Sequence, residues 1–327
     1  MKRKKLSTQE LVAGIKEGNR VVLSRAITLI ESQKEVDVAQ SEEILQSILP
    51  YTGNSYRLGI TGVPGVGKST FIESFGTLLT EKGKKLAVLT IDPSSQRTKG
   101  SILGDKTRME SLARNKNAFI RPSASGTTLG GVSGKTREVM LLCEAAGFDF
   151  IIIETVGVGQ SETLVHGMVD FFLLLMLAGA GDELQGIKKG IMEMADAVVI
   201  NKADGDNVSM SKRAKKEYQN ALHLFPANPN GWIPQVKTCS SIDGKGLQEV
   251  FEMLEKYERQ TQGNGFFDQN RSEQQVAWFK ENLDVLLKTA FFKKPEVRSL
   301  YEKKLKEVKA GKIPVLNAAH QVLDFMI

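Results

Sequence analysis

The chain has 327 residues, of which 41% are hydrophobic, enough for a sizeable core in one large domain with extensions or in two domains. Lys and Arg (44) exceed Asp and Glu (38), giving a net charge of +6; this surplus is spread out apart from the opening MKRKK and demands no nucleic-acid partner. The two cysteines, Cys143 and Cys239, lack CxxC spacing, which excludes a disulfide framework and favours two core residues. The three histidines are scattered, which argues against a soft-metal site.

Nothing in the sequence predicts export or a membrane span. MKRKK is followed by STQE, a helix-capping signature, and not by the apolar stretch of a signal peptide. The most apolar run, FFLLLMLAGA at 171–180, is far shorter than the ~20 residues that cross a bilayer as a helix. We therefore expect a cytoplasmic protein that does not enter the membrane.

Residues 1–50 are expected to form an N-terminal helical extension. Ser7 and Glu10 have the spacing of a capping box, and apolar residues recur at helical intervals from Leu11 to Ile30.

Residues 51–262 alternate short apolar runs with helical stretches, which predicts an α/β domain. Seven runs are expected to be strands: RLGITG, KLAVLTID, AFIRPSA, DFIIIETVG, DFFLLLMLAG, ADAVVINKAD and VKTCSS. Their near-continuous hydrophobicity indicates burial on both faces, hence a mostly parallel central sheet flanked by helices. The glycine-rich run 123–138 is interpreted as a surface loop, where Lys135 or Arg137 could meet phosphate or a partner.

Residues 263–327 are expected to form a C-terminal helical arm. QGNGFFDQN, 262–270, is interpreted as a linker, and helices are expected to begin near Pro295 and Pro314. Such an arm has little core of its own, so its apolar stripe would be buried against the main domain or a second subunit.

The first predicted strand leads into a phosphate-binding pattern, G-x-x-x-x-G-K-[ST]. Glycines let successive backbone N–H groups point at phosphate oxygens, and the helix that follows adds the positive end of its dipole. Lys68 is expected to reach the β and γ phosphates, and Ser69 to offer its hydroxyl to Mg²⁺. The residues expected to contact the nucleotide here are Gly62, Val63, Pro64, Gly65, Val66, Gly67, Lys68, Ser69 and Thr70.

Two acidic residues end predicted strands, at the edge where open α/β sheets bind ligands. Glu154 closes DFIIIETVG and Asp92 closes KLAVLTID. Both are candidates to face Mg²⁺ or its waters, although an acid before Pro93 is also typical of a turn cap.

The run ADAVVINKAD contains N-K-x-D, which predicts guanine recognition. The Asp204 carboxylate would accept from guanine N1–H and the exocyclic amine, an edge that adenine does not present. Asn201 precedes it, and the methylenes of Lys202 could lie along the base. After the next strand a turn of Ser240, Ser241 and Ile242 could offer N–H groups to the guanine carbonyl. GTP or GDP is therefore the expected nucleotide.

With these residues in place, 57–262 closely resembles the MeaB/ArgK family of GTPases associated with methylmalonyl-CoA mutase. The resemblance rests on long strings: GVPGVGKST, IDPSS, GSILGDKTRM, AFIRPS, LLCEAAGFD, ETVGVGQSE, AGAGDELQGIKKGIMEMAD and NKAD. It implies a P-loop GTPase that serves a cobalamin-dependent acyl-CoA mutase in cofactor loading and protection. It also implies a homodimer formed through the C-terminal arm.

The same resemblance implies roles for further residues. Asp92, Asp105 and Glu154 would cluster around Mg²⁺ and the γ-phosphate, with Gly157 beside the nucleotide. The segment 178–188 would be a mobile switch; its candidate sensing residues are Asp182, Glu183, Gln185 and Lys188. Without the family, this segment would be interpreted as a capped surface helix. No D-x-H-x-x-G string is present, so cobalamin is expected to travel on the partner and not to bind this chain directly.

One expected catalytic feature is missing. Small GTPases place a glutamine after the glycine that follows the metal-side carboxylate, and it orients the attacking water. Here Val158 follows Gly157, and Gln160 lies two residues further on. We therefore expect slow hydrolysis until a partner orders the switch with Asp105 or Asp182, or supplies or aligns a cation. The internal candidate cations include Arg97, Arg108 and Lys188.

Three other functions remain open at this point. A kinase-like accessory protein of an arginine/ornithine transport system should prefer ATP, against which N-K-x-D argues. A metal-delivery GTPase would usually carry His or Cys clusters, which the sequence lacks at ligand spacing. A GTPase that binds nucleic acid or membrane is disfavoured, because no aromatic platform or basic amphipathic helix stands out.

Overall fold

The computed structural model describes residues 5–32, 34–91, 109–123, 129–155, 161–179, 189–226 and 228–326. The chain forms two compact units, Met1–Gln274 and Gln275–Ile327. Within the described ranges, no helix is both long enough and apolar enough to cross a membrane.

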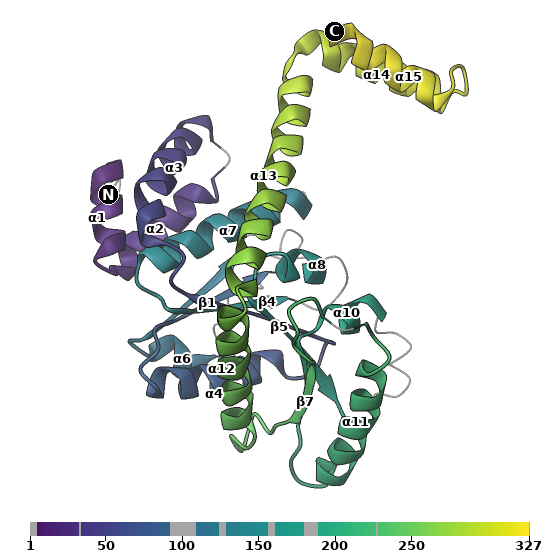
Figure 1. Ribbon diagram of the computed structural model, residues 1–327. Coiled ribbons are helices and arrows are strands. Elements are labelled where there is room, and N and C mark those ends of the chain that lie inside the picture. The colour runs from purple at the N-terminus through teal and green to yellow at the C-terminus, as the bar shows by residue number, and fades with distance from the viewer. Residues whose placement is uncertain are drawn as a thin grey trace. The chain divides into compact units, whose positions relative to one another are not determined.

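The first unit contains a seven-stranded sheet in which every strand pairs in parallel, as the apolar runs predict (Figure 1). The strand order is β3-β2-β4-β1-β5-β6-β7. The bounds are β1 Tyr56–Gly62, β2 Leu86–Ile91, β3 Ala118–Ser123, β4 Phe150–Thr155, β5 Phe171–Leu177, β6 Ala197–Asn201 and β7 Gln235–Thr238.

Helices cover both faces of this sheet. Alternate residues of a strand point to opposite faces, so Ile152 of β4 joins one hydrophobic cluster while Ile151 and Ile153 join another. The first cluster includes side chains of α4 (Lys68–Glu81), α6 (Glu110–Arg114) and α12 (Leu247–Gly263). The second includes α7 (Leu129–Ala145) and α8 (Ser161–His166). Short α10 (Lys189–Met194) and α11 (Asn207–Leu222) pack with β5 and β6.

The N-terminal residues form three helices, α1 (Thr8–Lys16), α2 (Arg20–Ile30) and α3 (Glu35–Ile48), followed by the short η1 (Leu49–Tyr51). The expected capping box is confirmed: Ser7 accepts from the Glu10 amide, and Glu10 accepts from the Ser7 amide at 2.8 Å. Apolar side chains of α1 to α3 share a hydrophobic cluster with α7 and β4, and all three helices pack against α7.

Two interpretations of local sequence are wrong. The expected linker at 262–270 is mostly helical: α12 ends at Gly263 and α13 (Phe266–Lys293) begins after Gly265, whose φ of 77° allows the tight turn. Most of the expected loop at 123–138 belongs to α7. In that helix Lys135 pairs with Glu138 at 3.0 Å, and Arg137, 5% exposed, donates to the Gly167 carbonyl at 2.9 Å.

The second unit contains the end of α13, then α14 (Pro295–Lys309), α15 (Val315–Leu323) and η2 (Asp324–Met326). The two proline-marked helix starts are confirmed, since Pro295 opens α14 and Pro314 caps α15. The two cysteines are both buried, as expected, and burial raises the pKa of the Cys239 thiol to about 12.

Candidate nucleotide site at the carboxyl edge of the sheet

The phosphate-binding pattern lies between β1 and α4, at the carboxyl end of the central strand. Gly62, Gly65 and Gly67 have φ values of 153°, 82° and 90°, a region that favours glycine. A Cβ on Gly62 would also lie 2.5 Å from the Leu175 carbonyl oxygen. The loop therefore requires glycine at these positions for backbone reasons. Of the remaining loop residues, Pro64 is exposed and Val66 is buried, and Ser69 and Thr70 lie in the first turn of α4.

The Lys68 side chain folds back onto the phosphate-binding loop. Its ammonium donates to the Gly62 carbonyl at 2.7 Å and to the Val63 carbonyl at 3.4 Å, and the residue is 9% exposed. Burial lowers the pKa of Lys68, while the charges of Glu154 and Glu162 oppose that change. A cation held by two carbonyls at the N-terminus of a helix is placed to exchange them for phosphate oxygens.

Glu154 lies on the strand beside the loop. In β4 it pairs in register with Ile60 of β1 and Thr90 of β2, and it is 8% exposed. The adjacent Thr155 hydroxyl donates to the Thr61 hydroxyl at 2.8 Å, which ties the ends of the two strands together. The carboxylate and the Ser69 hydroxyl are hard oxygen donors of the kind Mg²⁺ prefers, so the residues present fit that ion. Among the described residues no group of three His, Cys, Asp or Glu side chains could hold a metal alone.

Asn201, at the end of β6, connects the phosphate loop to the predicted guanine turn. Its amide nitrogen donates to the Val66 carbonyl at 3.0 Å. Its amide oxygen accepts from the Ser241 hydroxyl at 2.7 Å, the Ser241 amide at 3.3 Å and the Cys239 thiol at 3.4 Å. One buried side chain therefore ties two loops far apart in sequence.

Lys202 makes a second connection to the phosphate loop. It is the described non-glycine residue with positive φ, 57°, and its ammonium donates to the Gly65 carbonyl at 2.9 Å. The sequence predicts only that the methylenes of Lys202 lie along the base. The structure adds the contact between its ammonium and the phosphate loop.

Asp204 is held by the turn that follows β7. One of its carboxylate oxygens accepts from the Ser240 hydroxyl at 2.6 Å, and that hydroxyl accepts from the Asp243 amide at 3.0 Å. Ser240 and Ser241 are buried, whereas Ile242, also predicted to contact nucleotide, is 80% exposed. The turn thus fixes an acceptor that could read the N1–H and amine edge of guanine.

Two residues of this site, Ser74 and Glu162, are not predicted from the sequence. The Ser74 hydroxyl, in the second turn of α4, donates to the Ser241 carbonyl at 2.5 Å. Glu162 is 1% exposed and its charge acts on Lys68. No local pattern marks either, because each acts on a segment distant in sequence.

Several predicted residues lie outside the described residues, and the structure does not place them. These are Asp92, Arg97, Asp105, Arg108, Gly157, Val158, Gln160, Asp182, Glu183, Gln185 and Lys188.

Known proteins are similar to this chain over most of its length. Residues 23–296 match the family model described as Methylmalonyl Co-A mutase-associated GTPase MeaB. A putative GTPase of Caulobacter vibrioides is 50% identical, covering 94% of each chain. GTPase ArgK of Escherichia coli is 45% identical over 97% of this chain and 96% of its own. The mouse methylmalonic aciduria type A homolog, mitochondrial, is 41% identical over 96% of this chain and 78% of its own.

A solved structure is also similar over nearly the whole chain. It is described as an LAO/AO transport system kinase, with a TM-score of 0.78 and 39% identity, covering 98% of this chain and 97% of that one. The chain therefore belongs to the MeaB family and is a P-loop GTPase.

Proposed function

We propose that this GTPase acts as a switch and chaperone for a cobalamin-dependent acyl-CoA mutase, methylmalonyl-CoA mutase in the first instance. The observation that carries the nucleotide part is the bridge at Asn201, which joins the phosphate loop to the turn that holds Asp204. The partner is inferred from the family description and from the relatives named for methylmalonic aciduria.

Two sets of described residues would bind the two ends of the nucleotide. Loop amides from Gly65 to Thr70 and the Lys68 ammonium would hold the phosphates, and Asp204 would hold guanine. Mg²⁺, when bound, neutralises charge that develops on the phosphate oxygens. Ser69 and Glu154 would hold the ion or its waters, together with Asp92 and Asp105.

Hydrolysis by the protein alone is proposed to be slow. Charge neutralisation is provided for, but Val158 stands where a water-orienting glutamine would be expected, and a hydrocarbon side chain cannot orient water. The mutase would act on the segment around 178–188 and so complete the site. The cofactor would remain on the mutase.

Single-turnover GTP hydrolysis, measured with and without purified methylmalonyl-CoA mutase, tests this proposal. We expect hydrolysis at least about tenfold faster with the mutase, a modest effect for a partner that completes a GTPase site. Bovine serum albumin at equal concentration is the control for nonspecific protein. Equal rates with and without mutase would contradict the switch, while leaving nucleotide binding intact.

A second candidate function follows from the similar structure described as a transport system kinase. It requires transfer of the γ-phosphate to a protein acceptor. Incubation with labelled GTP or ATP and a solute-binding protein would show a stable phosphoprotein only if this function holds.

We also propose a homodimer formed through the C-terminal residues. α13 has no buried residue, and its exposed apolar side chains recur at helical intervals. The residues of this stripe in the second unit are Val276, Phe279, Leu283, Leu286 and Leu287.

A further inference from the structure

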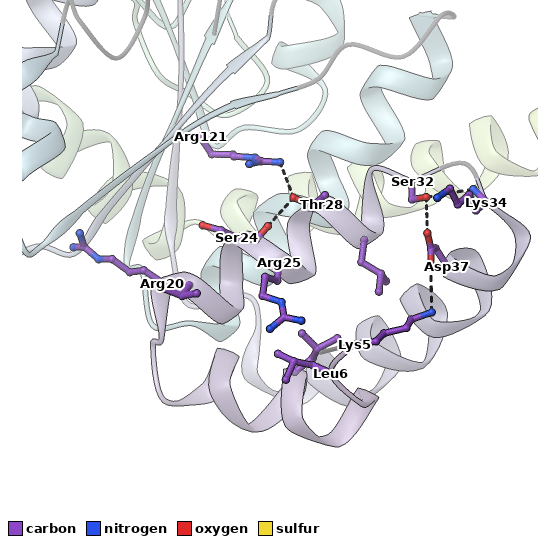
Figure 2. A pocket seen from close by; sticks show the side chains of 13 residues that line it. Lys5, Leu6, Arg20, Ser24, Arg25, Thr28, Ser32, Lys34, Asp37 and Arg121 are labelled. Atoms are coloured by element: carbon purple, nitrogen blue, oxygen red, sulfur yellow. Dashed lines mark hydrogen bonds and ion pairs between the residues drawn. The ribbon is translucent and has the colours of Figure 1, made fainter. Parts of the chain in front are cut away.

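A groove on the N-terminal helices is separate from the nucleotide site. It has a volume of about 990 Å³ and is lined by residues of α1 and the segment before it, of α2, of α3 and the segment before it, and by Arg121 of β3 (Figure 2). β3 is the edge strand farthest from β6 and β7, which carry the guanine-binding residues, so the groove is at the opposite side of the sheet.

The groove carries an excess of positive charge. Of the lining residues that the structure describes, five are cationic, namely Lys5, Arg20, Arg25, Lys34 and Arg121, and one, Asp37, is acidic. Asp37 lies 3.6 Å from Lys5, and Glu31 pairs with Arg121 at 2.5 Å. Arg25 has a polar partner of its own and is left out of the count, so the other four cations less these two acids leave a surplus of two.

No described carboxylate neutralises Arg20. Its guanidinium donates instead to the backbone carbonyls of Asn115 and Lys116. Backbone carbonyls orient the group without neutralising it. Lys34 is exposed; its charge acts on the Asp37 carboxyl, but among the described residues the ion pair of Asp37 is with Lys5.

The charges are spread along the groove and do not converge on a point. Arg20 begins α2 and Lys34 lies beyond its end, and the 11 residues of α2 span about 16 Å at ~1.5 Å per residue. A single phosphate would meet only one end of such a row. About five residues of extended peptide, at ~3.3 Å each, match this length.

Between the charges the lining is aliphatic. Leu6, Leu11, Val21 and Leu29 contribute to it, and Val21 is 70% exposed. The described part of the lining contains no aromatic side chain on which a nucleic-acid base could stack. Charge and apolar surface together match a peptide in which acids alternate with aliphatic residues.

We propose that this groove docks an extended acidic and aliphatic segment of a partner protein. The proposal rests on the proposed function only in that the GTPase has a protein partner. The nucleotide residues lie elsewhere, so docking can fail while GTP binding is intact.

Fluorescence anisotropy of a labelled peptide of alternating Glu and Val, titrated with the full chain saturated with GDP, tests the proposal. We expect binding that weakens with added salt, and no comparable binding of the same peptide with Gln in place of Glu. The variant Arg20→Gln/Lys34→Gln, which removes the charges at the two ends of the row, should bind the acidic peptide roughly tenfold more weakly. Lys34→Glu alone should also weaken it, should the double variant fail to fold.

The matched control is Lys212→Gln/Lys216→Gln, which removes the same charge from exposed positions on α11. It should bind the peptide as the unaltered protein does. Equal weakening in both double variants would show that only the net charge of the protein matters and would overturn the proposal. Absence of peptide binding to the unaltered protein would also overturn it. Tighter binding of an oligouridine or of phosphatidylglycerol vesicles, lost in the groove variant, would overturn it in favour of nucleic acid or membrane.

Discussion

At the scale of single residues, one buried carboxyl lies outside the nucleotide site and has a measurable consequence. Asp196 precedes β6, is 9% exposed and accepts a hydrogen bond from the Phe172 amide at 2.8 Å. Burial raises the pKa of Asp196 to about 7, although that hydrogen bond favours the charged form. The folded protein therefore binds this proton more tightly than the unfolded chain does.

This shift makes stability depend on pH. The contribution of the protonated Asp196 is complete below about pH 3.8 and is lost as the pH rises toward about 7, the folded-state pKa. Asp196→Asn, which stays neutral and keeps an acceptor for Phe172, should raise the free energy of unfolding at pH 8 by on the order of 2 kcal/mol relative to the unaltered protein. The gain should shrink toward pH 4. Urea unfolding at pH 4 and pH 8 measures this gain, with Asp206→Asn, at an exposed position, as control. A gain in the free energy of unfolding that is the same at both pH values would contradict the raised pKa of Asp196.

Local sequence predicts candidate residues for the nucleotide site but not the contacts between them. The glycine spacing predicts the loop, and N-K-x-D predicts the residues at the end of β6. The bonds from Lys202 to the Gly65 carbonyl and from Ser74 to the Ser241 carbonyl join positions 137 and 167 apart in sequence. Such contacts depend on the order of strands in the sheet, which local pattern does not contain.

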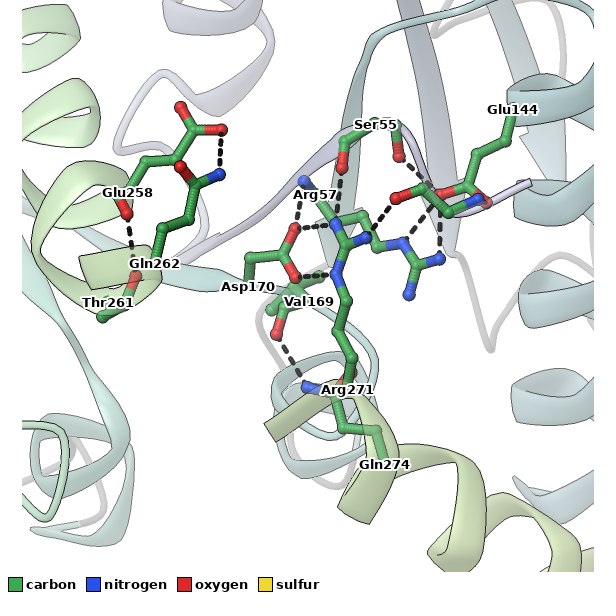
Figure 3. A network of polar contacts seen from close by, with 11 residues as sticks. Ser55, Arg57, Glu144, Val169, Asp170, Glu258, Thr261, Gln262, Arg271 and Gln274 are labelled. Atoms are coloured by element: carbon green, nitrogen blue, oxygen red, sulfur yellow. Dashed lines mark hydrogen bonds and ion pairs between the residues drawn. The ribbon is translucent and has the colours of Figure 1, made fainter. Parts of the chain in front are cut away.

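At the scale of elements, the start of α13 is tied to the sheet by a buried charge network (Figure 3). Arg271 pairs with both carboxylate oxygens of Asp170, each at 2.7 Å. Asp170 also accepts from the Arg57 amide at 2.8 Å, and the Arg57 guanidinium lies 2.8 Å from Glu144. The Asp170 side chain is 1% exposed, so it depends on these donors.

Removing Arg271 should therefore be costly. Arg271→Met leaves a buried carboxylate without its bidentate partner and should lower the free energy of unfolding by about 3 kcal/mol. Arg213→Met, which breaks an exposed ion pair with Glu217 on α11, should cost less than about 0.5 kcal/mol. Denaturant unfolding of both variants makes the comparison, and equal losses would show that the network contributes no more than a surface pair.

The elements themselves follow closely from sequence where apolar periodicity is strong. All seven strands coincide with apolar runs, and Pro295 and Pro314 mark helix starts. The errors fall where glycines dominate, at the beginning of α7 and between α12 and α13. Glycine permits a turn without requiring one, and packing against the sheet decides the outcome for α7, whose apolar residues lie in the core.

At the scale of the whole molecule, the chain forms two compact units, and the second one exposes apolar surface. Its described part carries the α13 stripe and an apolar cavity of about 460 Å³ lined by residues from the end of α13, α14 and α15. Exposed apolar side chains at regular helical spacing favour association with another surface.

The proposed homodimer predicts a specific loss. Phe279→Asp/Leu286→Asp places two charges on the α13 stripe and should convert a dimer to a monomer, because buried unpaired carboxylates are costly. Lys288→Asp, which changes the net charge equally but lies on another face of the helix, should remain dimeric. Sedimentation velocity distinguishes these outcomes; a monomeric unaltered protein, or a dimeric stripe variant, would rule out this interface.

Guanine recognition by Asp204, the acid after β6, is the central claim, and nucleotide specificity tests it directly. Titration calorimetry of the unaltered protein should show GDP bound at least ~10³-fold more tightly than ADP. Asp204→Asn should reverse the preference toward xanthosine diphosphate, because the amide offers a donor to the carbonyl that replaces the guanine amine. If the unaltered protein binds ADP and GDP equally, or if Asp204→Asn leaves the preference for GDP unchanged, the assignment of this site is wrong.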